Sequence, residues 1–196
     1  MIVHREGTHW RLISQMAHAW LAGELASAWG NEQFCTPVPF AAVVLATRLH
    51  DIGWLEWDAA PRLDDDHRPV NFINTTLADT IPIWRRAVRR VSLLDSYAGL
   101  LVSKHASTIY RRRRERGVDP PEAGGRLGEV EDEQKTIQAA IIHQLATHPI
   151  YGTAIDDVHL RAAYRWLRAC DLISLDRKST RLNSSHSQQS RMPSSA

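Results

Sequence analysis

Residues 39–54 read PFAAVVLATRLHDIGW, and this stretch decides the fold. Pro39 suits the first turn of a helix, and the apolar run that follows leads directly to His50 and Asp51. Gly53 is expected to end this helix. Imidazole and carboxylate groups together suit a borderline or hard divalent metal ion. The end of this helix therefore predicts one part of a metal site.

Apolar residues recur at helical spacing on both sides of this stretch. Ser14 is placed to cap a first helix in which Met16, Trp20, Leu21 and Leu25 recur, with Gly30 ending it. Further helices are expected over about 77–93 (interrupted near Pro82), from Asp95 or Ser96 to the arginine run 111–114, over about 130–147, and from Asp156 or Asp157 onward. Residues 54–76 and 117–128 are rich in Pro, Gly or Asp and predict irregular segments. No stretch alternates like a strand, so we expect an all-α, single-domain helical bundle of about six main helices.

Composition limits the class of protein. The chain has 196 residues, of which 43% are hydrophobic, enough for one domain with a core. It has no apolar run long enough for a membrane helix and no apolar signal core at its start. Cys35 and Cys170 are too few for a disulfide scaffold and show no metal-type pairing. A reduced, cytoplasmic protein is the expectation.

Residues 176–196 differ from the rest of the chain. They show no hydrophobic periodicity, and they resemble the translation of a common sequencing adapter. We therefore expect a domain of residues 1–175, C-terminally truncated, followed by a non-native disordered tail. Without the tail the chain has 20 basic and 21 acidic residues, so its net charge is −1 and the positive charge of the whole sequence comes from the tail. The charge gives no reason to expect a nucleic-acid partner.

Two further residues stand in settings that suggest metal binding. His18 lies in the middle of the first predicted helix, and Asp171 lies among apolar residues of the last one. A carboxylate with apolar neighbours is costly unless it is paired or binds a metal.

In this order, His18, His50–Asp51 and Asp171 resemble the H…HD…D signature of the HD superfamily. The resemblance implies a helical bundle of HD type in which these four residues are the metal ligands. A closer resemblance is to a bacterial HD-like family of unknown function, carried by HAWLAGELA (18–26), LHDIGWLEWDAAPRLD (49–64), YAGLLVSKH (97–105) and CDLISL (170–175). The phrase DLIS also resembles the Asp-x-x-Ser end of many HD domains.

Other polar residues near this signature are candidates for binding or catalysis. In two-metal enzymes of the HD superfamily, extra histidines between the His–Asp pair and the last Asp bind the second metal. The resemblance therefore makes His105 an additional metal-ligand candidate, and because it is the one such histidine that is well placed, it implies a mononuclear site. Lys104 or His105 could instead contact a substrate anion. Glu56 and Asp58, just after the His–Asp pair, could act as a base or orient water.

The remaining clusters have a simpler interpretation. Two arginine clusters could attract phosphates: residues 85, 86, 89 and 90, and residues 111–114 and 116. The simpler interpretation is that both lie on solvated helix faces, where the acidic stretch 129–133 neutralises part of their charge. Trp54 and Trp57 fit either a substrate pocket or core packing. His4, His9, His67, His143 and His148 are expected to be surface or structural residues.

The resemblance implies a metal-dependent phosphohydrolase acting on a small phosphorylated substrate or nucleotide, with Asp51, Glu56, Lys104 and His105 as catalytic candidates. The metal would be manganese, iron, nickel, magnesium or zinc. One alternative is an iron-dependent oxygenase, and another is a non-catalytic helical module that binds a metal or ligand. A homodimer is compatible with the sequence, and no membrane partner is expected.

Overall fold

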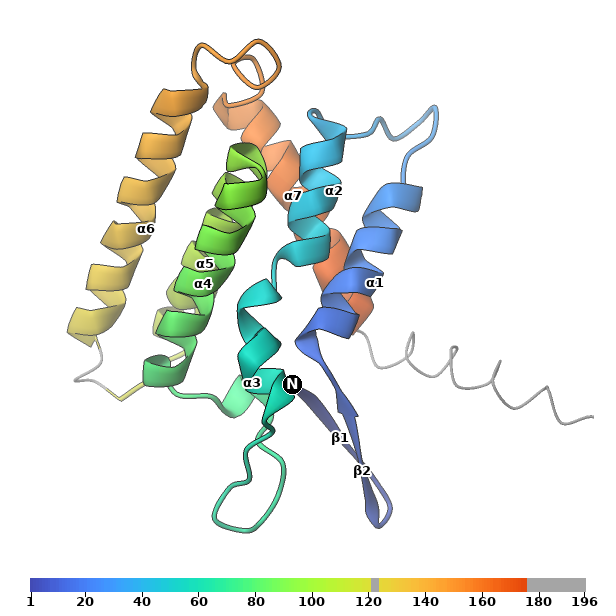
Figure 1. Cartoon of the computed structure of the whole chain (residues 1–196), viewed down its shortest axis with the longest axis vertical. Helices are drawn as coiled ribbons and strands as arrows, with labels where there is room; N and C mark the ends of the chain where they lie inside the picture. The colour runs from blue at the N-terminus through green and yellow to red at the C-terminus, as the bar shows by residue number, and fades with distance from the viewer. Residues whose placement is uncertain (121–123, 176–196) are drawn as a thin grey trace, which may run out of the picture.

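The computed structural model describes residues 1–120 and 124–175 of the chain; the predicted tail 176–196 lies outside the described residues. Within the described part, six helices of ten residues or more form the body of the molecule (Figure 1). They are α1 (Gln15–Ala28), α2 (Phe40–Leu49), α4 (Leu77–Leu94), α5 (Ser96–Glu115), α6 (Gly124–Leu145) and α7 (Asp157–Leu175). A short helix α3 (Leu55–Ala59) and two 3₁₀ turns, η1 (Ile52–Trp54) and η2 (Phe72–Asn74), connect α2 to α4. The predicted all-α single-domain bundle is confirmed.

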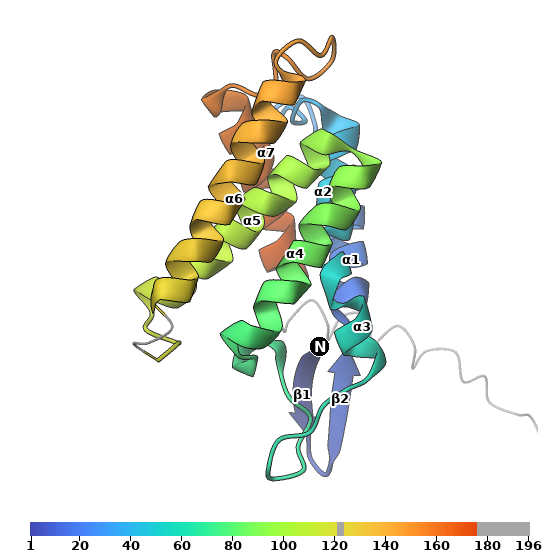
Figure 2. The same ribbon diagram turned by 60° about the vertical axis from the view of Figure 1, so that its left-hand side comes forward.

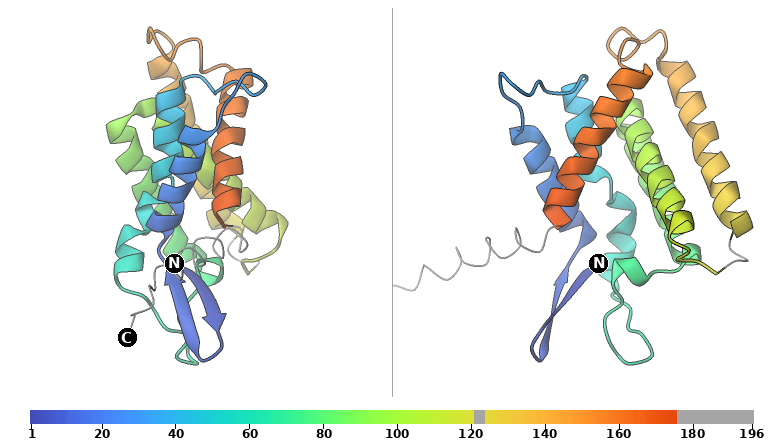
Figure 3. Two further views of the ribbon diagram at one scale, coloured as in Figure 1. Left: turned by 90° about the vertical axis from the view of Figure 1, so that its right-hand side faces the viewer. Right: turned by 180° about the vertical axis from the view of Figure 1, so that it is seen from behind.

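The helices form one packed body. α1 packs against α2 and α7, α2 also packs against α5 and α7, and α5 lies between α4 and α6. Figure 2 shows α4, α5 and α6 side by side, and Figure 3 shows α7 crossing the back of α1 and α2. The main core lies between these helices and includes fully buried Tyr97, Leu100, Leu101, Tyr110 and Leu167.

The start of the chain corrects one prediction, because it forms two strands. β1 (Ile2–Glu6) and β2 (His9–Ile13) pair antiparallel and extend from one end of the bundle (Figure 1). Gly7, with φ of 59°, opens the two-residue loop between them, as hairpin loops favour. Most of the hairpin is exposed on both faces, so its sequence lacks the apolar alternation by which a strand is recognised.

Helix α1 buries a different face from the one its large apolar residues suggest. Ser14 caps it as predicted, accepting a hydrogen bond from the backbone N–H of Ala17 at 3.0 Å. However, Trp20 is 57% exposed, and the buried face consists of Gln15, His18, Ala19, Ala22, Gly23 and Ala26. A Cβ on Gly23 would meet the Cα of Arg48 in α2 at 2.9 Å. Small residues therefore bring α1 close to α2, and His18 points inward with them.

Two helix boundaries also differ from expectation. α4 runs through Pro82 without interruption. Proline has no N–H to donate to the carbonyl of Ala78, but both residues are exposed, so water can reach that carbonyl. α6 begins at Gly124, inside the segment predicted to be irregular, while Ile141 and Leu145 are buried as expected.

Gly53 has a structural role other than ending α2. It lies within η1, and a Cβ there would stand 2.0 Å from the carbonyl oxygen of Ile83 in α4. Arg86 and Arg90 of α4 donate hydrogen bonds to the carbonyls of Gly53 and Ile52 at 3.2 and 3.0 Å. The turn after Asp51 is thus fixed directly on the backbone of α4.

Candidate metal centre

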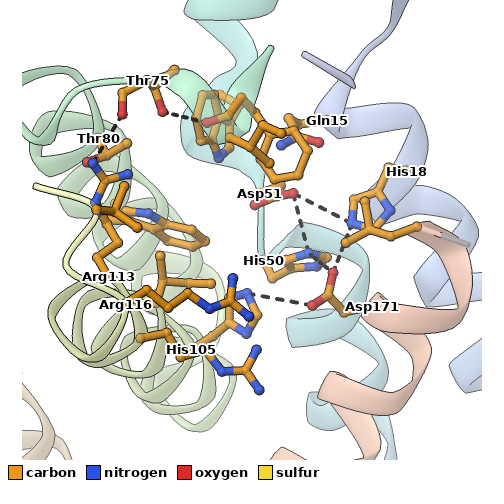
Figure 4. Close-up of a pocket in the computed structure, with 18 residues that line it drawn as sticks. Gln15, His18, His50, Asp51, Thr75, Thr80, His105, Arg113, Arg116 and Asp171 are labelled. Carbon is orange, nitrogen blue, oxygen red and sulfur yellow. Dashed lines mark hydrogen bonds and ion pairs between the residues drawn. The ribbon is translucent and has the colours of Figure 1, made fainter. Parts of the chain in front are cut away.

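Five of the predicted site residues meet in the interior of the bundle, where four helices come together. His18 comes from α1, His50 and Asp51 from the end of α2, His105 from α5 and Asp171 from α7. None of the five is more than 7% exposed. Figure 4 shows their side chains converging, with His105 on one side and His18 and Asp51 on the other. Residues 153 positions apart in sequence are therefore in direct contact.

The hydrogen bonds of His18 determine which of its nitrogens faces the cluster. The Ser174 hydroxyl donates to the carbonyl oxygen of Asp171 at 2.8 Å, and it lies 2.8 Å from Nδ1 of His18. Because the hydroxyl has a single proton, it accepts a hydrogen bond from Nδ1–H of His18. Nε2 of neutral His18 then presents a lone pair, and it lies 3.0 Å from Oδ1 of Asp171. Two acceptors at that distance require a proton or a cation between them.

His50 is oriented in the same way. Its Nδ1–H donates to the carbonyl oxygen of Thr47 at 2.7 Å, which fixes the tautomer and directs Nε2 into the cluster. Nε2 is buried and has no hydrogen-bond partner within the described residues. It lies 3.4 Å from both Oδ2 of Asp51 and Oδ1 of Asp171. Histidines that bind metals are typically held by a backbone carbonyl or a carboxylate at the other nitrogen.

These separations fit ligands of one metal ion. Two atoms each about 2.1 Å from a metal are about 3.0 Å apart at a right angle and about 3.4 Å apart at the tetrahedral angle. His18 and His50 lie at 3.0 and 3.4 Å from the same oxygen of Asp171. The 3.8 Å between His18 Nε2 and Asp51 Oδ2 is wider than either value.

His105 joins the cluster from α5. Its Nε2 lies 4.0 Å from Oδ2 of Asp171, and its ring centroid is 5.2 Å from that of His50. Two groups of three potential ligands result, and in each group the ligand atoms lie within 4.8 Å of one another. The first group is His18, His50 and Asp51; the second is His50, His105 and Asp171. Because His50 belongs to both groups, they are overlapping halves of one cluster.

Burial and the charges of their neighbours shift the pKa values of the clustered side chains. Burial lowers the pKa of His50, but Asp51 and Asp171 outweigh it and raise the pKa to about 9. Burial lowers the pKa of His105 to about 4. Burial raises the pKa of Asp51, whereas for Asp171 the histidines overcome burial and hold the pKa well below its usual value. The cluster thus favours one positive charge between its carboxylates, which a proton or a metal ion can supply.

The cluster forms one wall of a cavity of about 210 Å³. All five residues line it, together with Gln15, Trp54 and Trp84. The wall formed by α5 continues from His105 through Ile109 to Arg112 and Arg116, and Figure 4 shows Arg113 and Arg116 on the His105 side. A small molecule in this cavity would contact the candidate ligands directly.

The other predicted catalytic residues are not brought to this cavity. Glu56 is paired with Arg90 and Arg86 on the surface, and the hydrogen bond from Arg90 lowers its pKa to about 2. Lys104 is on α5 one residue before His105 and does not line the cavity. The side chain of Asp58 is 5% exposed; it accepts a hydrogen bond from the N–H of Gln15 at 2.5 Å and pairs with the α-amino group of Met1 at 2.8 Å.

Several site residues were missed or interpreted differently from sequence. Arg112 and Arg116 line the cavity, although the arginine run was interpreted as a solvated face. Their signal is the spacing of four, three and four from His105 through Ile109, which places all of them on one face of α5. Gln15 also lines the cavity and is 2% exposed. The sequence signal for Ser174 is its position three residues after Asp171, in the phrase DLIS.

The remaining predictions concern the charged clusters, the tryptophans, the cysteines and a membrane helix. Arg85 and Arg114 pair with Glu133 and Glu131, as expected of the acidic stretch. Trp54 lines the cavity, whereas Trp57 packs in a small apolar cluster with Trp54 and Ile83. Both cysteines are free, Cys35 exposed and Cys170 buried. Among the described residues, no helix is long and apolar enough to cross a membrane.

Comparison with known proteins places the chain in a family. The family described as protein of unknown function, DUF3891, matches residues 1–194. No curated protein and no solved structure matches the chain. Because the match covers almost the whole sequence, the chain belongs to the DUF3891 family.

Proposed function

We propose that the buried cluster binds a divalent metal ion and that the protein is a metal-dependent phosphohydrolase of HD type. The observation that carries this proposal is the contact between Nε2 of His18 and Oδ1 of Asp171, two acceptors 3.0 Å apart on the wall of a cavity. The unpartnered Nε2 of His50 beside the same oxygen supports it. Together with Asp51 and His105, the donor set is three imidazoles and two carboxylates, which suits manganese, iron, nickel or zinc better than magnesium.

In this proposal His18, His50, Asp51 and Asp171 hold the metal, with His105 as a fifth ligand or a contact to the substrate. A divalent metal held there would lower the pKa of a water molecule and polarise a phosphoryl oxygen. Ser174 and the carbonyl of Thr47 keep the two histidines in the tautomer that binds a metal.

Asp51 is the proton acceptor in this proposal. It lines the cavity, and its Oδ2 lies 3.4 Å from Nε2 of His50. Its carboxylate would orient a water molecule toward a phosphorus atom in the cavity and accept the proton that this water loses. The buried walls of Trp54 and Trp84 limit access of other water to the same place.

The test is phosphate release by the full chain, reconstituted separately with each metal and supplied with phosphomonoesters and nucleotides. Asp51→Asn should lower kcat/KM by about 100-fold or more, because general acid–base groups contribute that much. Glu56→Gln, a matched carboxylate outside the cavity, should change it less than about twofold. Metal-loaded protein that releases phosphate from none of these compounds would contradict the proposal, and iron-loaded protein that consumes oxygen would favour an oxygenase.

A further inference from the structure

Two arginines on the cavity wall have no ion-pair partner among the described residues. Arg112 and Arg116 both line the cavity, and neither forms an ion pair with a residue of the described chain. Their neighbours on α5 are paired: Arg111 with Glu115 at 3.9 Å and Arg114 with Glu131 at 2.8 Å. Within the run 111–116, the two arginines that have no ion pair with a described residue both line the cavity.

Arg113 also faces the cavity but has its charge balanced. It lies in a bidentate pair with Asp119, whose side chain is 6% exposed, and it donates to the carbonyl oxygen of Thr75 at 3.2 Å. These contacts hold the end of α5 against the segment before α4. The net positive charge at this end of the cavity thus comes from Arg112 and Arg116.

The order of residues along α5 separates this charge from the metal cluster. His105, Ile109, Arg112 and Arg116 lie on one face of the helix. At about 1.5 Å of rise per residue, the backbone of Arg112 is about 10 Å from that of His105, and Arg116 is about 16 Å from it. Ile109 lies between them, and Phe72 and Val118 add further apolar surface to the same cavity.

We propose that Arg112 and Arg116 form a second anion site, which binds a phosphate group of the substrate other than the one that reacts. This inference rests on the proposed function for the identity of the reacting group. Two guanidinium groups match a phosphate monoester, which carries close to two negative charges at neutral pH and accepts bidentate hydrogen bonds. The substrate class is then a molecule with two phosphate groups joined by a body that is at least partly apolar.

The test measures binding, which does not require turnover. Alkane-α,ω-bisphosphonates with spacers of increasing length, and the alkyl monophosphonates of the same lengths, are titrated calorimetrically into the metal-loaded full chain. Because a second group on the same molecule binds at high effective concentration, one spacer length should bind at least about tenfold tighter than its monophosphonate. Arg112→Ala/Arg116→Ala should abolish this advantage, whereas Arg111→Ala/Arg114→Ala, the matched pair of partnered arginines, should keep it.

The outcomes distinguish this inference from the function it rests on. Equal affinity for both compounds at every length would overturn the second site. So would an equal loss of monophosphonate and bisphosphonate binding in Arg112→Ala/Arg116→Ala, since the arginines would then hold the reacting phosphate. A bisphosphonate advantage in a protein that hydrolyses no phosphoester would support the anion site and refute the hydrolase. Hydrolysis of monoesters without that advantage would do the reverse.

Discussion

Ser174→Ala should weaken metal binding although Ser174 is not a ligand. The Ser174 hydroxyl is 3% exposed and accepts the Nδ1–H of His18 at 2.8 Å. When Nε2 binds a metal, loss of the hydroxyl leaves that buried N–H without an acceptor, which costs about 1–3 kcal/mol. At about 1.4 kcal/mol per tenfold change in affinity, this is a loss of about 5- to 150-fold.

The metal-free protein should respond much less to the same change. Without a metal, the proton of His18 can move to Nε2 and face Asp171 at 3.0 Å, so no buried N–H is left unpaired. Competition titration of manganese or zinc against a chelator measures the affinity, and chemical denaturation of the metal-free protein measures the stability. Ser27→Ala is the matched control, because the Ser27 hydroxyl makes the same kind of bond to a carbonyl three residues earlier, that of Glu24, but on an exposed face. Unchanged metal affinity in Ser174→Ala, or an equal loss in Ser27→Ala, would refute this reasoning.

Three further predictions concern Gly53, His50 and Glu56. Gly53→Ala should lower the free energy of unfolding by about 3 kcal/mol or more, since its Cβ would stand 2.0 Å from the carbonyl oxygen of Ile83; a denaturation midpoint like that of the unmodified chain would contradict the close approach. The pKa of His50 is raised to about 9, so its contribution to the stability of the metal-free protein is full below about pH 6.5 and lost as the pH rises through about 9. Metal affinity should rise as the pH rises over that same range, because the metal displaces the proton of His50. Calorimetry at pH 7 in buffers of different ionisation enthalpy should show that about one proton is released per metal ion bound. Release of no proton would show that His50 is already neutral. Glu56→Gln should change stability by less than about 1 kcal/mol, because its pair with Arg90 is solvent-exposed, and a larger loss in thermal unfolding would count against this.

Most of the fold could be predicted because the helices carry their own local signals. Ser14 caps α1, and the apolar spacing of α5 and α7 marks their buried faces. The hairpin lacked such a signal, because residues exposed on both faces need no alternation. The continuity of α4 could not be predicted either, since a proline within a helix is tolerated only where the carbonyl left without a partner faces solvent, as at Pro82.

The site residues that could be predicted are polar residues with apolar neighbours in the sequence. His18 and Asp171 each stand among apolar residues in the sequence, so each was expected to be buried and to need a polar partner or a metal. Glu56 follows the His–Asp pair closely in sequence, yet α3 turns it outward to Arg90. Arg112 and Arg116 belong to a run of similar residues, and their spacing from His105 distinguishes them only once His105 is known to face the cavity.

The metal content of the purified full chain tests the central claim most directly. After reconstitution with manganese, iron, nickel or zinc and removal of excess metal, elemental analysis should find about one metal ion per chain. Asp171→Asn keeps the size of the side chain but removes the charge that His18, His50 and His105 share, so it should lose the metal while circular dichroism shows unchanged helicity. His143→Ala, an exposed histidine on α6, should retain it. Protein that binds none of these metals, or an Asp171→Asn variant that retains the full amount, would contradict the account.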